Sequence, residues 1–215
     1  MQIDLIQAGI RFGNSWVARN ITYTFKQGCT YALLGNNGSG KSSLLQLIAG
    51  NHTPTEGQVE FEDNGKKIPP ERFFKSISLV APYLSLPEEL TVSELLNFHS
   101  HFKKSFFSAK EITEFIWLDK DRSKEIRQLS SGMKQRLKLG LGFFYHSSVL
   151  LFDEPITHLD SKGIEWYEGL IEKYTYGRTI IVASNQHREY GFCAEIIDLE
   201  SYKPAARIKQ NRAII

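Results

Sequence analysis

The sequence has little of several features that would assign a protein to a class at once. It holds two cysteines, Cys29 and Cys193, and they are not spaced like metal ligands, so we expect a reducing compartment. Its net charge of +2 is too small to indicate nucleic acid binding. No segment approaches the ~18 consecutive apolar residues of a membrane-spanning helix. These absences predict a soluble, cytoplasmic protein.

The sequence also lacks signs of targeting or of a second domain. Residues 1–4 show neither a basic region nor the start of a long apolar run, so we expect no secretory signal. There is no internal repeat, low-complexity tract or linker. Because 215 residues with 41% hydrophobic content suffice for one full core, we expect a single domain over residues 1–215.

The most informative segment that is present is the glycine-rich run 35–42, which lies between a β-rich run at 30–34 and a helical pattern at 43–49. This context fits the phosphate-binding loop G-x-x-x-x-G-K-[ST]. Glycines let the backbone approach a polyphosphate, and the loop N–H groups and the helix N-terminus then face the phosphates. Lys41 would neutralise the β- and γ-phosphates, and the Ser42 hydroxyl would bind Mg²⁺. The sequence therefore predicts a nucleoside triphosphate site, with these candidate residues: Gly35, Asn36, Asn37, Gly38, Ser39, Gly40, Lys41, Ser42 and Ser43.

A second segment places two carboxylates at the end of a predicted buried strand. Residues 149–152 form a continuous apolar run, as in a strand covered on both faces of a parallel sheet. Asp153 and Glu154 follow at its carboxyl end, where ligands bind in open α/β sheets, and Pro155 ends the strand. We predict that Asp153 holds Mg²⁺ and that Glu154 is the general base for the attacking water. Alone, the pair would equally fit a solvated acidic turn.

A third segment, Ser130-Ser131-Gly132, opens a predicted helix in which Met133 and Leu137 share one face. A helix N-terminus with a serine hydroxyl and a glycine backbone can bind an anion. Alone it would be an ordinary N-cap.

Together these segments resemble the motifs of the ATP-binding subunits of ATP-binding cassette (ABC) transporters, over essentially the whole chain. The four matching segments are 35–42 for Walker A, 129–133 for the signature (usually L-S-G-G-Q), 150–154 for Walker B and 157–160 for the D-loop (usually S-A-L-D).

The resemblance implies a function and a set of partners. It implies ATP and Mg²⁺ as ligands, ATP hydrolysis, and a head-to-tail dimer with a second copy or a related ABC subunit. Ser130, Ser131 and Gly132 of one subunit would contact the ATP bound at Lys41 of the other, with Asp160 at the seam. It further implies an integral membrane permease as partner and a peripheral place on the cytoplasmic face of the membrane, and no nucleic acid is expected.

The resemblance also implies an α/β fold, that of a P-loop NTPase of the ABC-ATPase type. This fold has a mostly parallel core sheet, an N-terminal antiparallel β part and an inserted helical lobe. We assign residues 1–82 and 128–215 to the nucleotide-binding core with its antiparallel part, and 84–127 to the lobe. Strand-like runs at 21–25 and 57–61 suit the antiparallel part.

Further expectations concern the lobe and the adenine contact. Two capping boxes, 91–94 and 108–111, would start helices of the lobe. Apolar residues follow at helical spacing, and we interpret them as core of the lobe: Leu95, Phe98, Phe102, Ile112, Phe115 and Ile116. In the family, a groove beside the lobe receives a helix of the permease, and the candidates to line it are Tyr83, Leu84 and Leu86. The family also places an aromatic ring on adenine, for which Phe12 is the first match and Trp16 the alternative.

Two positions depart from the family pattern. The family carries a glutamine after the strand at 77–80, where this chain has Ala-Pro-Tyr with Pro82 in the middle. The family also carries a histidine after its last core strand, where this chain has Asn185, with His187 two residues further on. Asn185 can donate a hydrogen bond but cannot become cationic, and losing one preorganised donor commonly costs ~10²–10³ in rate. We expect slow hydrolysis, with Asn185 as a catalytic candidate beside Glu154 and Lys41.

Other interpretations of the motifs remain open. A non-transport ABC ATPase usually has two cassettes or a long coiled coil, and a slow ATP-gated dimerisation clamp would suit Pro82 and Asn185. An unrelated P-loop kinase would account for the phosphate loop but not for the signature. The helical lobe and the short tail at 200–215 favour the transporter subunit.

Overall fold

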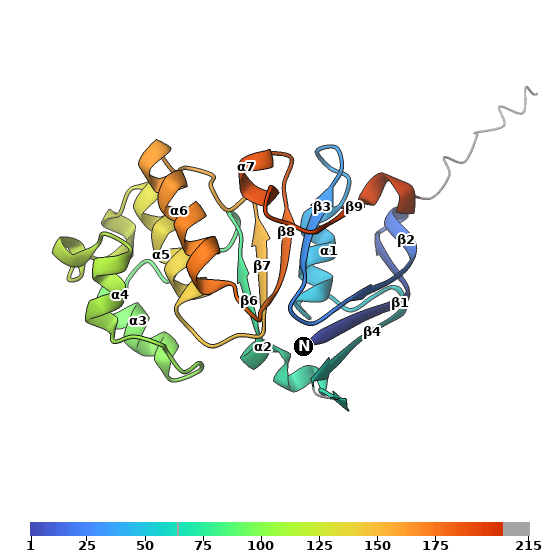
Figure 1. The fold of residues 1–215 in the computed structure, drawn as a ribbon, viewed down its shortest axis with the longest axis horizontal. Helices are drawn as coiled ribbons and strands as arrows, with labels where there is room; N and C mark the ends of the chain where they lie inside the picture. The colour runs from blue at the N-terminus through green and yellow to red at the C-terminus, as the bar shows by residue number, and fades with distance from the viewer. Residues whose placement is uncertain (64, 204–215) are drawn as a thin grey trace, which may run out of the picture.

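The computed structural model describes residues 1–63 and 65–203, so residues 204–215 of the predicted tail lie outside the described residues. The described chain contains two β-sheets, with helices on both sides of the larger one (Figure 1). None of its helices is both long and apolar enough to span a membrane.

The central sheet is parallel and has the strand order β6-β7-β8-β3-β9. Its strands are β3 (Thr30–Leu34), β6 (Ile77–Val80), β7 (Val149–Asp153), β8 (Thr179–Ala183) and β9 (Glu195–Asp198). The apolar run of β7 is buried along its whole length, with Val149 and Leu151 in one hydrophobic core and Leu150 and Phe152 in another. Successive side chains of a strand point to opposite faces, so the continuous run is explained by a sheet covered on both sides.

One face of this sheet packs on helix α1 (Lys41–Ile48) and on a second, antiparallel sheet. This sheet has the order β2-β1-β4-β5, with β1 (Gln2–Phe12), β2 (Ser15–Phe25), β4 (Glu56–Asp63) and β5 (Lys66–Lys67). The predicted strand runs at 21–25 and 57–61 lie in β2 and β4. A short connection follows, with a 3₁₀ turn (Pro70–Arg72) and α2 (Phe73–Ser76) leading to β6.

The opposite face is covered by helices, which Figure 1 shows on the side of the sheet away from α1. They are α3 (Val92–Ser100), α4 (Ala109–Phe115), α5 (Ser131–Phe143) and α6 (Ser161–Tyr174). Thr91 and Ser108 cap α3 and α4, each through a side-chain oxygen that accepts from the backbone N–H of the glutamate three residues on. The glutamate side chain in turn accepts from the backbone N–H of the cap residue, so both predicted capping boxes are present. Two 3₁₀ turns, Asp119–Asp121 and Ile126–Gln128, lead on to α5.

The interpretation of the lobe's aromatic stripe was wrong at two positions. Phe98 and Phe102 are each 52% exposed and contact one another edge-on, with ring centroids 5.1 Å apart. Val92, Leu95 and Leu96 instead form the face of α3 that packs into the core of the lobe. Phe98 lies to the side of this face, and Phe102 follows the end of the helix at Ser100.

The last two helices of the described chain are short, and the second contacts the phosphate loop through Glu200 and Asn36. The short helix α7 (His187–Tyr190) follows β8, and the 3₁₀ helix η4 (Leu199–Tyr202) follows β9. The division of residues 1–215 into a core at 1–82 and 128–215 and a lobe at 84–127 stays a prediction.

Candidate nucleotide-binding site

The glycine-rich loop joins β3 to α1, as predicted, and its conformation requires glycine at Gly40. This residue is the N-cap of α1 with φ +102°, a left-handed conformation that side chains rarely adopt. A Cβ atom there would lie 2.1 Å from Cγ1 of Val17. The loop therefore presents bare backbone, with the N-terminus of α1 directly behind it.

Lys41 is folded onto the loop that precedes it and is only 8% exposed. Its Nζ donates to the carbonyl oxygen of Gly35 at 2.6 Å and to that of Asn36 at 3.3 Å. The Ser39 hydroxyl, inside the same loop, is buried and has no hydrogen-bond partner among the described residues. A cationic amine and an unsatisfied hydroxyl thus lie within a loop shaped for an anion.

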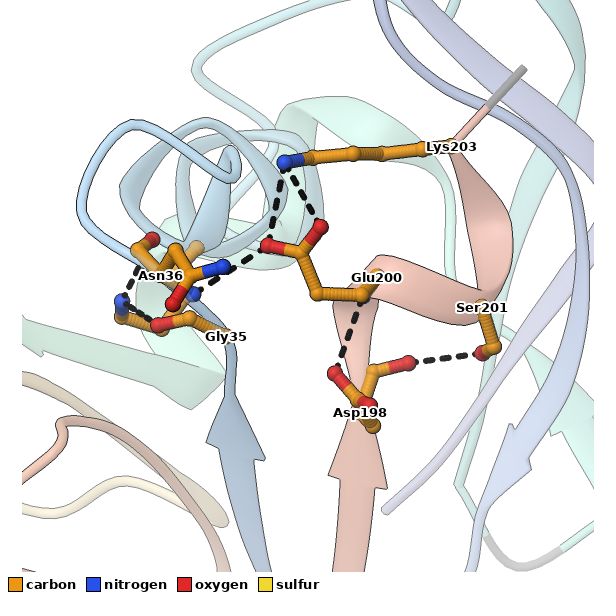
Figure 2. Close-up of polar contacts among 7 residues, drawn as sticks. Gly35, Asn36, Asp198, Glu200, Ser201 and Lys203 are labelled. Atoms are coloured by element: carbon orange, nitrogen blue, oxygen red, sulfur yellow. Dashed lines mark hydrogen bonds and ion pairs between the residues drawn. The ribbon is translucent and has the colours of Figure 1, made fainter. Parts of the chain in front are cut away.

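The segment after β9 holds the start of the loop (Figure 2). The Asn36 N–H donates to the carboxylate of Glu200 at 3.2 Å, and Lys203 pairs with the same carboxylate at 2.8 Å. The pKa of Glu200 is lowered mainly because its carboxylate accepts a hydrogen bond from the Lys203 ammonium. Asp198 caps the turn by accepting from the Glu200 N–H at 3.0 Å. The carboxylate is therefore neutralised locally and does not compete with phosphate for Lys41.

Asp153 lies at the carboxyl end of β7, beside the N-terminus of α1, and is almost fully buried. Burial is the largest influence on its pKa and raises it, and the neighbouring Glu154 charge raises it further. Hydrogen bonding from the hydroxyls of Ser42 and Tyr83 and the positive charge of Lys41 act in the opposite direction. A cation bound here would offset the cost of keeping this carboxylate ionised.

Glu154 follows directly and has an unusual backbone. Its φ is +44°, a left-handed conformation that costs roughly 1–3 kcal/mol for a residue other than glycine. Its N–H donates to the Ala183 carbonyl at the end of β8, at 3.0 Å, which fixes the turn. The side chain is exposed on the cleft that contains Lys41, in contrast to the buried Asp153.

The cleft has a volume of about 290 Å³ and brings residues from four parts of the chain together. Its lining is Phe12, Val17, Asn37, Gly38, Gly40, Lys41, Ser42, Ser43, Asp153 and Glu154. Phe12 is 52% exposed there, with its ring edge-on to His52. Trp16 does not line the cleft, because Arg11 and Arg19 lie over its ring. The geometry supports Phe12 rather than Trp16 as the aromatic wall.

The predicted signature residues lie outside this cleft. Ser130 is the N-cap of α5 and accepts a hydrogen bond from the Met133 N–H at 3.3 Å. Ser131 is exposed beside it, and Gly132 abuts the carbonyl of His158, since a Cβ at Gly132 would lie 2.9 Å from that oxygen. Asp160 caps α6 by accepting from the Gly163 N–H at 2.8 Å. The structure therefore brings the signature to the D-loop of its own chain, not to its own phosphate loop.

The two departures from the family pattern occupy different places. The Asn185 amide donates to the side-chain oxygen of Asn37 at 3.3 Å, so Asn185 contacts the phosphate loop through a residue that lines the cleft. His187 contacts Tyr190 and lines a separate hollow beside α6, away from the cleft.

Pro82 lines another hollow, of about 190 Å³, together with Tyr83, Leu84 and Leu86. The three candidates for the groove beside the lobe therefore lie together there.

Sequence analysis missed three functional candidates near the carboxylates. Tyr83 was considered only for the groove, yet its hydroxyl also acts on Asp153, and burial together with the Asp153 charge raises the pKa of Tyr83 to about 12. Gln135 and Glu189 are buried polar residues beside the turn that carries Glu154. None of the three has a sequence signal, because each lies in an ordinary helical or loop context.

The residues present fit Mg²⁺ and a polyphosphate. Among the described residues there is no group of three or more histidine, cysteine or acidic side chains that could hold a metal alone. Magnesium is usually held by one or two protein oxygens together with phosphate oxygens, which is what Ser42 and Asp153 offer. The bare backbone at Gly40 and the unsatisfied Ser39 hydroxyl suit the phosphates.

Comparisons with known proteins agree with this geometry. The sequence model of the family described as ABC transporter matches residues 18–157. The chain is 32% identical over 192 residues to the uncharacterized ABC transporter ATP-binding protein YybJ of Bacillus subtilis (strain 168), covering 87% of the chain and 86% of YybJ. It is 33% identical over 192 residues to the Nod factor export ATP-binding protein I of Rhizobium sp. (strain N33), covering 85% of the chain and 62% of that protein.

Solved structures show the same fold. The dimeric ATP-binding cassette MJ0796, in a post-hydrolysis state bound to ADP and Pi, superposes with a TM-score of 0.79 at 23% identity, covering 91% of the chain and 93% of MJ0796. This likeness confirms the predicted α/β fold class, with its parallel core sheet, antiparallel part and helices.

Proposed function

This chain belongs to the ABC transporter family of ATP-binding proteins, and we propose that it is the ATP-hydrolysing subunit that drives a separate membrane permease. The observation that carries the proposal is the convergence of Lys41, Ser42, Asp153 and Glu154 on one cleft. Two of these come from the start of α1 and two from the end of β7. They are the residue types that phosphoryl transfer to water needs.

Each residue has a distinct role in the proposed reaction. Lys41 moves from the loop carbonyls to the β- and γ-phosphates, and Ser42 and Asp153 hold Mg²⁺. Mg²⁺ held there would supply positive charge that offsets the charge developing on the transferred phosphate. Glu154 orients the attacking water and accepts its proton. Asn185 donates a neutral hydrogen bond from the far side of the loop, and Phe12 supplies the adenine contact.

We propose that the site is completed by a second copy of the chain or a related subunit, arranged head-to-tail. Ser130, Ser131 and Gly132 are supported in this role by their position outside the cleft of their own chain. An exposed helix N-terminus with a free backbone is suited to the γ-phosphate of a neighbouring subunit. Asp160, beside the signature glycine, would lie at the seam. MJ0796, which has the same fold, is described as dimeric, and this supports a dimer of the chain.

The proposed permease contact is the hollow lined by Tyr83, Leu84 and Leu86, with the helical lobe beside it. We propose that this contact with the permease holds the protein on the cytoplasmic face of the membrane. Affinity purification from detergent-solubilised membranes should recover a polytopic protein with the tagged chain. Recovery of the chain without any polytopic protein would contradict the transport half of the proposal.

The first test is steady-state ATP hydrolysis by the purified chain and by its Glu154→Gln variant. The glutamine keeps the shape of the side chain but cannot accept the proton, so we expect turnover to fall ~10²-fold or more, as for a lost general base. Binding of a fluorescent ATP analogue should be unchanged, because the phosphate loop is untouched. Equal turnover by the two proteins would contradict the assigned role of Glu154.

A slow ATP-gated clamp is the second candidate, favoured by Asn185, which places a neutral amide on the phosphate loop where the family carries histidine. A clamp would dimerise with Mg-ATP and show no measurable turnover in either protein of that test. A motor subunit would dimerise and lose turnover only in the variant.

A further inference from the structure

The turn that carries Glu154 is held by a buried acid that the proposed mechanism does not use. Glu189, on α7, is 0% exposed. Its Oε1 accepts a hydrogen bond from the Ile156 N–H at 3.0 Å. Ile156 lies two residues after Glu154, so the carboxyl group of Glu189 fixes the backbone immediately beyond the catalytic position.

The backbone of Glu189 is joined to the loop that follows β8 and holds Asn185. The Glu189 N–H donates to the Gln186 carbonyl at 2.9 Å, and the Ser184 Oγ accepts from the Gln186 N–H at 2.8 Å. Burial raises the pKa of Glu189, the charges of Glu154 and Asp153 raise it further, and the nearby Ser184 hydroxyl lowers it. The second carboxyl oxygen, Oε2, is buried and has no hydrogen-bond partner among the described residues. One residue thus bonds to the turn after Glu154 through its side chain and to the loop of Asn185 through its backbone.

A second buried side chain holds the turn from the opposite direction. Gln135, on α5 and 2% exposed, donates from Nε2 to the Pro155 carbonyl oxygen at 2.7 Å. The single peptide group between Pro155 and Ile156 is therefore bonded to α5 through its C=O and to α7 through its N–H. Because α5 begins at the signature, the turn is linked to the signature helix and to the loop after β8 at the same time.

We propose that Glu189 is a positioning residue that keeps Glu154 and Asn185 in a fixed relation, through the Ile156 N–H on one side and the loop of Ser184 and Gln186 on the other. The inference rests on the proposed function, because it assigns a role toward the same reaction. Misplacing a catalytic group by about 1 Å can cost ~10²-fold in rate without any loss of contact to the substrate. Removing the carboxyl group should therefore lower kcat and leave the affinity for ATP nearly unchanged.

The test compares Glu189→Leu with Glu189→Gln in the full chain. Leucine removes the acceptor for the Ile156 N–H, so we expect kcat to fall ~10- to 100-fold with the KM for ATP within about twofold. Glutamine keeps a carbonyl acceptor and can donate to Ser184 Oγ, so it should restore most of the activity. Tyr167→Phe is the matched control, because it removes the Tyr167 hydroxyl bond to the Glu189 backbone carbonyl at 3.1 Å and leaves the carboxyl group intact. It should lower Tm and leave kcat unchanged.

A second readout needs no turnover. Hydrogen exchange in peptides covering 154–160 and 183–187 should accelerate together in Glu189→Leu, and in neither peptide in Glu189→Gln. If Glu189→Leu fails to fold, Ser184→Ala should produce a smaller fall in kcat with the same unchanged KM. A loss in Glu189→Gln as large as in Glu189→Leu, or equal kcat in all the variants, would overturn the proposal.

The wild-type chain separates this inference from the proposed function. Wild-type protein that neither binds nor hydrolyses ATP would contradict the proposed function itself. Wild-type turnover with insensitive Glu189 and Ser184 variants would contradict only the positioning role.

Discussion

Glu154 lines the cleft and Asn185 contacts Asn37 of the phosphate loop, and the two side chains offer different chemistry. Glu154 sits on a strained left-handed backbone that is held by the Ala183 carbonyl. Asn185 reaches the phosphate loop through Asn37 but can offer only a neutral donor. At the scale of the residue, the proposed base has a fixed backbone and the proposed electrostatic donor carries no charge.

Asn185→His should therefore raise the ATP turnover of the chain. An imidazolium at this position can stabilise charge on the γ-phosphate, and one such donor is commonly worth ~10²–10³ in rate, so we expect a gain of about tenfold or more. Asn185→Ala is the control, since it removes the Asn37 contact without adding a donor. Turnover in the histidine variant no higher than in the alanine variant would show that position 185 does not face the γ-phosphate.

The buried side chain of His99 should make the free energy of unfolding depend on pH. Burial, with a smaller contribution from the Lys103 charge, lowers the pKa of His99 to about 4, and its ring is edge-on to Tyr145. The unfolded chain takes up this proton near the ordinary pKa of 6.5, so the folded state binds fewer protons between about pH 6.5 and 4. The free energy of unfolding should fall as pH is lowered through that window. In His99→Gln this part of the slope should be absent from denaturation curves, and an unchanged slope would contradict the assignment.

Residue identities in the cleft could be predicted because they lie in motifs with fixed spacing around a strand and a helix. Phe12 as the adenine contact stays a prediction; Phe12 lines the cleft, whereas two arginines lie over the ring of Trp16. Tyr83, Gln135 and Glu189 could not be predicted, because their contacts join segments that are distant in sequence and carry no local pattern.

At the scale of the element, most boundaries follow from local chemistry. The capping boxes at Thr91 and Ser108 start α3 and α4. The apolar run of β7 ends at its last residue, Asp153, which precedes the turn of Glu154. The exposure of Phe98 and Phe102 could not be predicted from spacing alone, since periodicity gives the angle of a side chain and not what covers it. Helix α7 is only one turn long and has no pattern of its own.

Two substitutions of Asp160 can separate its role as the N-cap of α6 from its proposed role at the dimer seam. Asp160→Ala removes the N-cap acceptor for Gly163 and should cost about 1 kcal/mol of stability. Asp160→Asn keeps an equally good cap and removes the charge, so the melting temperature should be unchanged. ATP-dependent dimerisation of the asparagine variant, measured by sedimentation, then reports on the seam. A melting temperature as low as that of the alanine variant would contradict the capping role.

At the scale of the whole molecule, the arrangement of the motifs implies that one chain does not contain a full catalytic site. The cleft gathers the phosphate loop and both carboxylates, while Ser130 caps α5 outside it. The fold could be predicted from the motif order, and the relatives and solved structures agree with it. The head-to-tail assembly stays a prediction from the resemblance, because it depends on contacts with another subunit.

The most direct measurement mixes two inactive variants, Lys41→Ala and Ser130→Arg, and records ATP hydrolysis. In a head-to-tail dimer, a mixed pair has one site with both defects and one intact site, so an equal mixture should recover about a quarter of wild-type turnover. If phosphate loop and signature act within one chain, every site in the mixture carries a defect. No recovery on mixing, with wild type active and both variants folded under the same conditions, would contradict the account.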